Sequence, residues 1–184
     1  MGPLAGIRVL DFTRVVAGPL ATRILADQGA EVIKVEPPEG DLSRTFPPLL
    51  ENEITPYFAQ QNAGKLFCSF DLSHDETPQL VAELATKCDV IVENFRPGVM
   101  AKYGLDYETL SKKNPRLVYC SITGFGQTGP WANRRAYAPI GHLESGLIEY
   151  DERKNDRPAR QPSLVPVSYT HLRAHETSLQ LVCR

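Results

Sequence analysis

Three neighbouring residues, Asn94-Phe95-Arg96, combine an amide, an aromatic ring and a guanidinium directly after an apolar run. A guanidinium can fork onto a phosphate or carboxylate, and an aromatic ring can stack on a flat ligand ring. At the end of a parallel strand, these side chains would reach the rim where α/β sheets bind ligands. The spacing therefore predicts a recognition site, against a structural alternative in which Asn94 caps the Pro97-Gly98 turn and Arg96 is solvated.

Two other turns carry candidate chemistry. The first leads from Phe12 into Gly18-Pro19, which opens a helix whose free N–H groups and dipole favour an anion such as a phosphate. The second is a glycine-rich loop, residues 124–130, followed by Arg134-Arg135-Ala136-Tyr137 with two cations and a phenol. The structural alternatives are a simple strand-to-helix turn for the first and a solvated basic pair for the second.

The elements that must position these turns alternate between strands and helices. Apolar runs predict five strands, and helical spacing between them predicts helices, one of which groups Leu20, Ile24 and Leu25 on one face. This alternation predicts an α/β fold, a Rossmann-like parallel sheet with helices on both faces. The proline-rich segment 37–56 is expected to be a long surface loop. The predicted strands are residues 7–12, 31–36, 66–70, 89–93 and 116–122, and the helices begin at 18, 57, 76 and 107.

Composition narrows the classes of function. The 184 residues are 42% hydrophobic with a formal charge of −2, which fits one ordinary core and gives no overall reason to expect nucleic acid or an anionic membrane as a partner. No apolar run reaches membrane-spanning length and no signal peptide is recognisable, so we expect a cytoplasmic protein. Four separated cysteines indicate neither a zinc site nor a disulfide framework, and Cys68 and Cys120 are expected to be buried strand thiols.

Two common nucleotide-binding classes do not fit. Glu36 stands where the acidic ribose ligand of a dinucleotide-binding domain is expected, but the turn TRVVAGPLAT has one glycine instead of three. The segment Ala63-Gly64-Lys65 lacks both the first glycine and the hydroxyl residue of a phosphate loop. A kinase or ATPase is therefore excluded.

Six ordered blocks resemble the class III coenzyme A transferases, which include the formyl-CoA, carnitine-CoA and succinyl-CoA transferases. The resemblance extends over residues 3–165 and rests on PLAGIRVLDFTRVVAGPLATRILADQGAEVIKVEPPEGDLSR, QNAGK, VIVENFRPGV, YGLDYETL, NPRLVYCSITGFGQTGP and AYAPIGHLESGL. It implies transfer of CoA from an acyl-CoA to a small carboxylic acid through a covalent aspartyl intermediate. It also implies that CoA is a substrate, that no cofactor is permanently bound, that no metal is needed, and that the full-length protein is an interlocked homodimer.

The same resemblance assigns the residues that contact CoA. They lie in the turns already singled out, with additions after the third strand and in the helix that follows residue 98. The implied contacts are Val16, Ala17, Phe70, Asp71, Leu72, Ser73, Asn94, Phe95, Arg96, Lys102, Arg134, Arg135, Ala136 and Tyr137.

The chain also departs from the family pattern. Val16 stands where some members have glutamine, Pro37 and Pro38 replace an arginine for which Arg44 could compensate, and Ala63 replaces another, which leaves Lys65 as the expected cation there. Tyr137 occupies the position of the racemase histidine, which favours a transferase over an acyl-CoA racemase, and a structural role is expected for His142. A noncatalytic nucleotide-binding module is the third alternative.

The C-terminal end differs most from the family. Relatives carry the nucleophilic aspartate shortly after a run such as LVPVS, whereas this chain has His171 near that position, so the catalytic residue is unknown. The run PVSYTHLRAHET resembles a translated transposon end used in sequencing adaptors. We therefore expect residues 166–184 to be a non-native tail, His171 and His175 not to be a metal pair, and residues 1–165 to be an inactive N-terminal part of the CoA-binding large domain.

Overall fold

The computed structural model describes residues 2–50, 54–137, 140, 143–155 and 181–183. They belong to two compact units, Met1–Ile122 with Cys183–Arg184 and Thr123–Val182.

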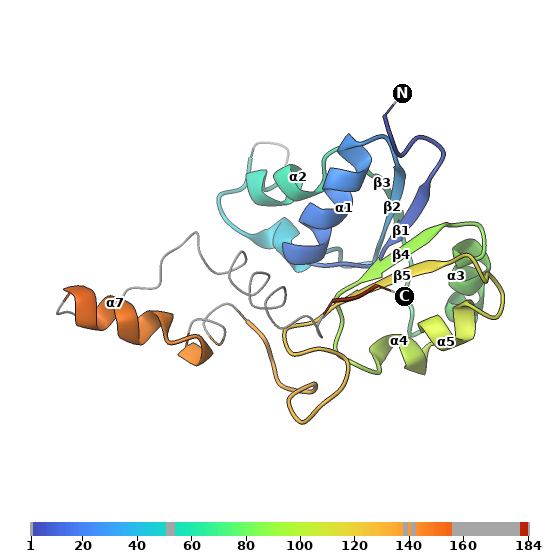
Figure 1. The fold of residues 1–184 in the computed structure, drawn as a ribbon. Coiled ribbons are helices and arrows are strands. Elements are labelled where there is room, and N and C mark those ends of the chain that lie inside the picture. The colour runs from blue at the N-terminus through green and yellow to red at the C-terminus, as the bar shows by residue number, and fades with distance from the viewer. Residues whose placement is uncertain (1, 51–53, 138–139, 141–142, 156–180, 184) are drawn as a thin grey trace. The chain divides into compact units, whose positions relative to one another are not determined.

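The first unit is built on a sheet whose strands follow the order β3-β2-β1-β4-β5 (Figure 1). The four pairings among the first five strands are all parallel, with Leu10 opposite both Ile33 and Ile91. This confirms the predicted parallel sheet. The strands are β1 (Arg8–Asp11), β2 (Glu31–Glu36), β3 (Leu66–Ser69), β4 (Val90–Glu93), β5 (Val118–Ile122) and β6 (Leu181–Cys183).

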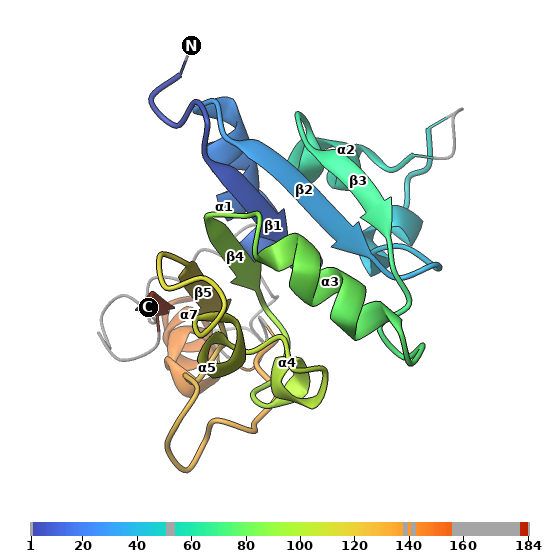
Figure 2. The ribbon, with the colours of Figure 1, turned by 90° about the vertical axis from the view of Figure 1, so that its right-hand side faces the viewer.

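Helices cover both faces of this sheet, as expected. Figure 2 shows α1 and α2 behind the strands and α3 in front of them. Two short helices and a 3₁₀ turn complete the unit. The bounds are α1 (Ala17–Asp27), η1 (Leu42–Thr45), α2 (Pro56–Asn62), α3 (Thr77–Ala85), α4 (Val99–Lys102) and α5 (Tyr107–Leu110).

The core has two parts because successive strand residues point to opposite faces. Leu10 and Ile91 pack with Val81 of α3, whereas Val9, Val32 and Val92 form a second buried cluster with Leu25 of α1 packed against it. Cys88 is buried in the first cluster, and Cys68 and Cys120 are half-buried in β3 and β5. All three are free thiols.

Two details differ from the sequence prediction. Leu20 and Ile24 do not face the core but are 40% and 47% exposed, because α1 buries Gly18, Pro19 and Thr22 instead. Thr22 reaches the end of β1 with its hydroxyl, which donates to Asp11 Oδ2 at 2.6 Å. The buried face of α1 therefore includes a polar contact to β1, while Leu25 packs against the core.

The segment 37–56 is not simply a surface loop. It contains η1, and the side chains of Asp41, Ser43 and Thr55 are buried. Thr55 donates to the Ser43 carbonyl at 2.9 Å, so both ends of the segment are held by hydrogen bonds that polarity alone did not reveal. No helix in the described ranges is long and apolar enough to cross a membrane.

Candidate functional site

The strand order places a switch point between β1 and β4. From β1 the chain builds β2 and β3 on one side and then returns to place β4 and β5 on the other. In open α/β sheets, ligands generally bind at such a point, in a crevice at the carboxyl ends of the strands. The turns there are residues 12–16 and 94–98, so two of the three turns predicted from sequence lie at one place.

Asn94 joins these two turns. Its Oδ1 accepts a hydrogen bond from the Arg14 N–H at 2.8 Å, and its Nδ2 donates to the Arg14 carbonyl at 2.9 Å. The amide therefore forms a clip between the two turns, which neither of the roles considered from sequence anticipated. A contact between Asn94 and a ligand stays a prediction.

Phe95 and Arg96 differ in how much of each side chain is exposed to a ligand. Phe95 is half-buried against the core cluster on the α3 side, and its N–H donates to Glu93 Oε2 at 2.8 Å. Arg96 is exposed, and its guanidinium has no hydrogen-bond or ion-pair partner among the residues that the structure describes. Sequence reasoning missed Arg14, whose guanidinium carbon lies 4.9 Å from the Phe95 ring centroid. A second cation thus stands beside the pair.

The other predicted residues of this crevice, Val16 and Ala17, begin α1. Both are half-buried, and Val16 is the N-cap without a side-chain hydrogen bond to the helix. The first amides of an α-helix have no partner within the helix, although Pro19 contributes no N–H. The other N–H groups of this first helical turn can therefore donate to an anion.

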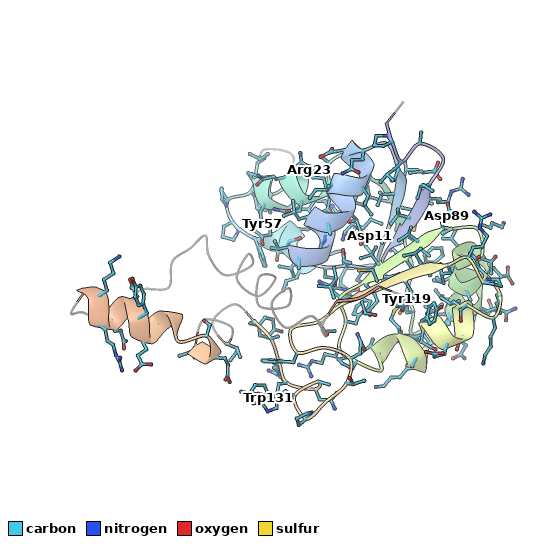
Figure 3. All side chains as sticks on the ribbon, in the orientation of Figure 1. Asp11, Arg23, Tyr57, Asp89, Tyr119 and Trp131 are labelled. Carbon is cyan, nitrogen blue, oxygen red and sulfur yellow. The ribbon has the colours of Figure 1, made fainter. Side chains whose placement is uncertain are left out.

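Below the turn lies a buried ion pair between Asp11 and Lys65, with 3.0 Å between Oδ2 and Nζ and no exposed side-chain surface on either residue. Asp11 also accepts from the Thr13 N–H and hydroxyl at 2.9 and 2.5 Å. Lys65 completes its bonding with the Pro19 carbonyl and Asn62 Oδ1. Asp11, labelled in Figure 3, ends β1 beside α1.

This arrangement corrects the expectation for Lys65. It is not a cation offered to a ligand, because all three ammonium hydrogens have protein acceptors and burial lowers the pKa of this amine. Arg44, the expected compensating cation, binds both carboxylate oxygens of Glu36 at 3.0 and 2.6 Å and stacks on Phe58. Its charge is therefore already neutralised.

A second buried pair joins Lys34 and Asp41, with Nζ 3.2 Å from Oδ2 and side chains 0% and 1% exposed. Burial works against the charged form of Asp41. Bonds from the Ser43 N–H and hydroxyl, from the Val15 N–H and the charge of Lys34 outweigh it and lower the pKa of the Asp41 carboxyl. The sequence carries one signal of this pair, because Lys34 interrupts the apolar run of a strand that is buried on both faces.

Glu93 contrasts with these paired carboxylates. It is 4% exposed and accepts from the Phe95 N–H and the Ser121 hydroxyl, and burial raises the pKa of its carboxyl. It supports the backbone that carries Phe95.

The turn after β3 lies at the same edge of the sheet, two strands from β1. Phe70 and Leu72 are half-buried against the core, whereas Asp71 and Ser73 are exposed and bonded to each other, with Ser73 Oγ 2.6 Å from Asp71 Oδ1. This bond lowers the pKa of Asp71. Lys102, the last residue of α4, is exposed.

The second unit contains the remaining predicted contacts. Arg134 is bonded to Glu144 Oε1 at 2.6 Å and lies over the rings of Phe125 and Trp131, the latter labelled in Figure 3. Arg135 and Tyr137 are exposed. Ala136 approaches Gly124 so closely that a Cβ on Gly124 would lie 1.8 Å from the Ala136 Cβ. This unit also includes α7 (Leu147–Asn155).

Some predictions fall outside the described residues, namely the roles of His142, His171 and His175 and most of the expected tail. Within the part of the chain that is described, no group of three or more His, Cys, Asp or Glu residues is arranged to hold a metal ion.

Sequence comparison decides the family. The chain matches the CoA-transferase family III over residues 4–172. It belongs to this family. Two similar relatives are the succinyl-CoA:glutarate CoA-transferase of Mus musculus, 45% identical over 161 residues, and the acetyl-CoA:oxalate CoA-transferase of Acetobacter aceti, 45% identical over 148 residues. These alignments include 87% and 80% of this chain but only 37% and 38% of the relatives, so the family III chain spans well under half of their length.

Solved structures of similar proteins support the same assignment. Rv3272 from Mycobacterium tuberculosis superposes with a TM-score of 0.82 at 37% identity, over 97% of this chain and 49% of that one. A CAIB/BAIF family protein from Brucella suis gives 0.80 at 37% identity, over 97% and 51%. The family and the parallel α/β fold expected from the sequence are thus confirmed.

Proposed function

We propose that this chain is the CoA-binding N-terminal part of an enzyme that transfers CoA between an acyl-CoA and a small carboxylic acid. The observation that carries the proposal is the pair of turns at the β1/β4 switch point, clipped together by Asn94 and flanked by the exposed Arg96. Phosphate groups suit a guanidinium and helix-start amides, and a purine suits the Phe95 ring. The named transferases among its relatives support this substrate class.

The buried carboxylates at the carboxyl edge are poor candidates for the nucleophile. Asp11 and Asp41 are bonded to buried lysines, Glu36 is bonded to Arg44, and Glu93 accepts a backbone N–H. The sequence contains no aspartate after Asp156. The alignments include only 37% and 38% of the two named relatives. We therefore propose that the nucleophilic aspartate belongs to a part of the full-length protein that this chain does not include.

In the proposed reaction, that carboxylate attacks the donor thioester and expels CoA thiolate, which leaves a mixed anhydride. The thiolate then attacks the aspartyl carbonyl, which releases the donor acid as a carboxylate and forms an aspartyl-CoA thioester. The acceptor carboxylate attacks this thioester and again expels CoA thiolate. Attack of the thiolate on the acceptor carbonyl of the second anhydride yields the new acyl-CoA and restores the aspartate.

The test is calorimetry with CoA on the full-length protein that contains residues 1–165. Phe95→Ala and Arg96→Ala are each expected to weaken CoA binding about tenfold, because a charge-assisted hydrogen bond or a stacked ring contributes roughly 1–3 kcal/mol. NAD should not bind, which separates this site from a dinucleotide-binding module.

Arg116→Ala is the matched control. Arg116 is also exposed but precedes β5, at the opposite edge of the sheet, so its loss should leave CoA binding unchanged. Equal effects of Arg96→Ala and Arg116→Ala, or unchanged affinity in both Phe95 and Arg96 variants, would contradict the proposed site.

Three further expectations remain proposals. They are the participation of Arg134, Arg135, Ala136 and Tyr137 in CoA binding, a cytoplasmic location, and homodimer formation. Dimerisation is supported by large apolar side chains that remain exposed on α1 and β3, namely Leu20, Ile24, Leu66 and Phe67. Analytical ultracentrifugation of the full-length protein should give twice the chain mass, and the 184-residue chain alone should show no transferase activity.

A further inference from the structure

Val15 has an unusual backbone conformation. Its φ is +69°, and it is the one non-glycine residue with positive φ in the described parts of the chain. A β-branched side chain is strained in this left-handed region because its Cβ crowds the backbone. Such a conformation persists only where the surrounding structure stabilises it.

The stabilising group is Asp41. Its two carboxylate oxygens lie 3.2 and 3.1 Å from the Val15 nitrogen. Asp41 is itself fixed, because it accepts from the Ser43 N–H and hydroxyl, both at 2.9 Å. Residue 15 is thus anchored to a segment 26 positions away in sequence.

Lys34, the ion-pair partner of Asp41, binds the backbone at the other side of the turn. Its ammonium donates to the Thr13 carbonyl at 2.6 Å while lying 3.2 Å from Asp41 Oδ2. The pair therefore binds the backbone on both sides of Arg14. Neither side chain is accessible to a ligand, since they are 0% and 1% exposed.

We infer that Asp41 and Lys34 are positioning residues for CoA binding, which hold Val15 in the left-handed conformation so that Val16 and Ala17 face the crevice. This inference rests on the proposed function, because it assigns a purpose to a turn that the proposal places against CoA. It predicts that the need for Asp41 depends on the side chain at position 15. Glycine adopts positive φ without a Cβ penalty and should make the turn less dependent on the anchor.

The experiment is a double-mutant cycle on CoA affinity in the full-length protein, measured by calorimetry. Asp41→Asn should raise the Kd about tenfold, because only a fraction of molecules keep the competent turn. Val15→Gly alone should change the Kd by less than about threefold, and Asp41→Asn added to Val15→Gly should cost less than about a further threefold. The KM for acyl-CoA should follow the Kd while kcat changes little, since neither residue reaches the reacting atoms.

Two controls separate positioning from general damage. Asp89 also accepts a backbone N–H, from Arg8 at 2.9 Å, but at the amino edge of the sheet, so Asp89→Asn should leave the Kd unchanged. Lys65→Met breaks the other buried pair without touching Val15, and glycine at position 15 should not relieve any weakening that it causes. Equal effects of Asp41→Asn with and without Val15→Gly would overturn the inference.

A readout without CoA keeps the two proposals distinguishable. In crystal structures of the unliganded variants, residue 15 should leave positive φ in Asp41→Asn and keep it in Asp41→Asn with Val15→Gly. If wild type binds no CoA, the proposed function fails whatever φ shows. If CoA binds and φ of Val15 remains positive in Asp41→Asn, the inference fails alone.

Loss of folding would also be decisive. If the Asp41→Asn variant does not fold, the double variant Lys34→Met/Asp41→Asn takes its place in the cycle. This double variant leaves no unpaired charge in the buried site. If that double variant folds only when Val15→Gly is added, the inference is supported. If it fails to fold both with and without Val15→Gly, the inference is overturned.

Discussion

The turns that leave β1 and β4 meet at one crevice but are built differently. The β1 turn is fixed from below by two buried ion pairs, Asp11–Lys65 and Lys34–Asp41, whose lysines have no exposed side-chain surface. Among the described residues, no buried ion pair holds the β4 turn: Asn94 bonds to Arg14, Glu93 accepts the Phe95 N–H, and the cation Arg96 is exposed. Charges near the crevice therefore divide into those that hold the backbone and those that remain free for a ligand.

Among the substitutions that test this difference between the two turns, Asp11→Ala is expected to lower the free energy of unfolding most. The substitution removes the partner of buried Lys65 and the acceptor for Thr13 and Thr22. We expect a loss of about 3–5 kcal/mol in the free energy of unfolding, because a buried charge is left unpaired. Urea denaturation measures it. A loss below about 1 kcal/mol would show that the β1 turn does not depend on its ion pairs.

A smaller effect is expected from Gly18→Ala in the β1 turn. An added Cβ would lie 2.2 Å from Thr13 Cβ and Cγ2, and Thr13 is fully buried, so the backbone must shift. We expect a loss of about 1–3 kcal/mol in the free energy of unfolding, measured by urea denaturation.

Gly98→Ala in the β4 turn is the counterpart of this substitution. An added Cβ there meets nothing within 4 Å, and only φ of +83° opposes it. About 1 kcal/mol should therefore be lost. If both substitutions cost the same in thermal or urea unfolding, the two turns are equally constrained.

The smallest effect concerns Glu93 below the β4 turn, whose pKa burial raises. A carboxyl with a raised folded-state pKa stabilises the fold below its unfolded pKa, and this contribution is lost as the pH rises through the folded pKa. Glu93→Gln keeps the shape without the charge. We therefore expect the variant to unfold at higher urea than wild type at about pH 8, and this advantage to shrink towards about pH 4, where wild-type Glu93 is protonated. A constant difference across this range would contradict the assignment.

Patterns within one element were readable from the sequence. The strand Glu31–Glu36 was predicted with the bounds that the structure has, because its apolar run is flanked by a glycine turn and prolines. The turn residues 94–96 were likewise placed at a strand end. Such features depend on neighbours in the chain, which periodicity and turn residues report.

Pairings between distant segments were not readable. Lys65 and Asp11 lie 54 positions apart in the sequence, and Arg14 and Asn94 lie 80 positions apart. No local pattern in one segment indicates which residue of the other segment it will contact. Of the apolar residues grouped on α1, Leu25 packs against the core but Leu20 and Ile24 are exposed, and the bond from buried Thr22 to Asp11 was not readable for the same reason. The expectation of Lys65 as a ligand cation failed because residue type does not show whether a charge is already bonded.

Burial of the thiols matters for a protein proposed to handle thioesters. Acyl groups move from CoA to any sufficiently ionised thiol within reach, since the thiolate is the nucleophile. Burial raises the pKa of Cys68 and raises that of Cys88 to about 11. At neutral pH the Cys88 thiol should therefore stay protonated and should not divert acyl groups into self-acylation.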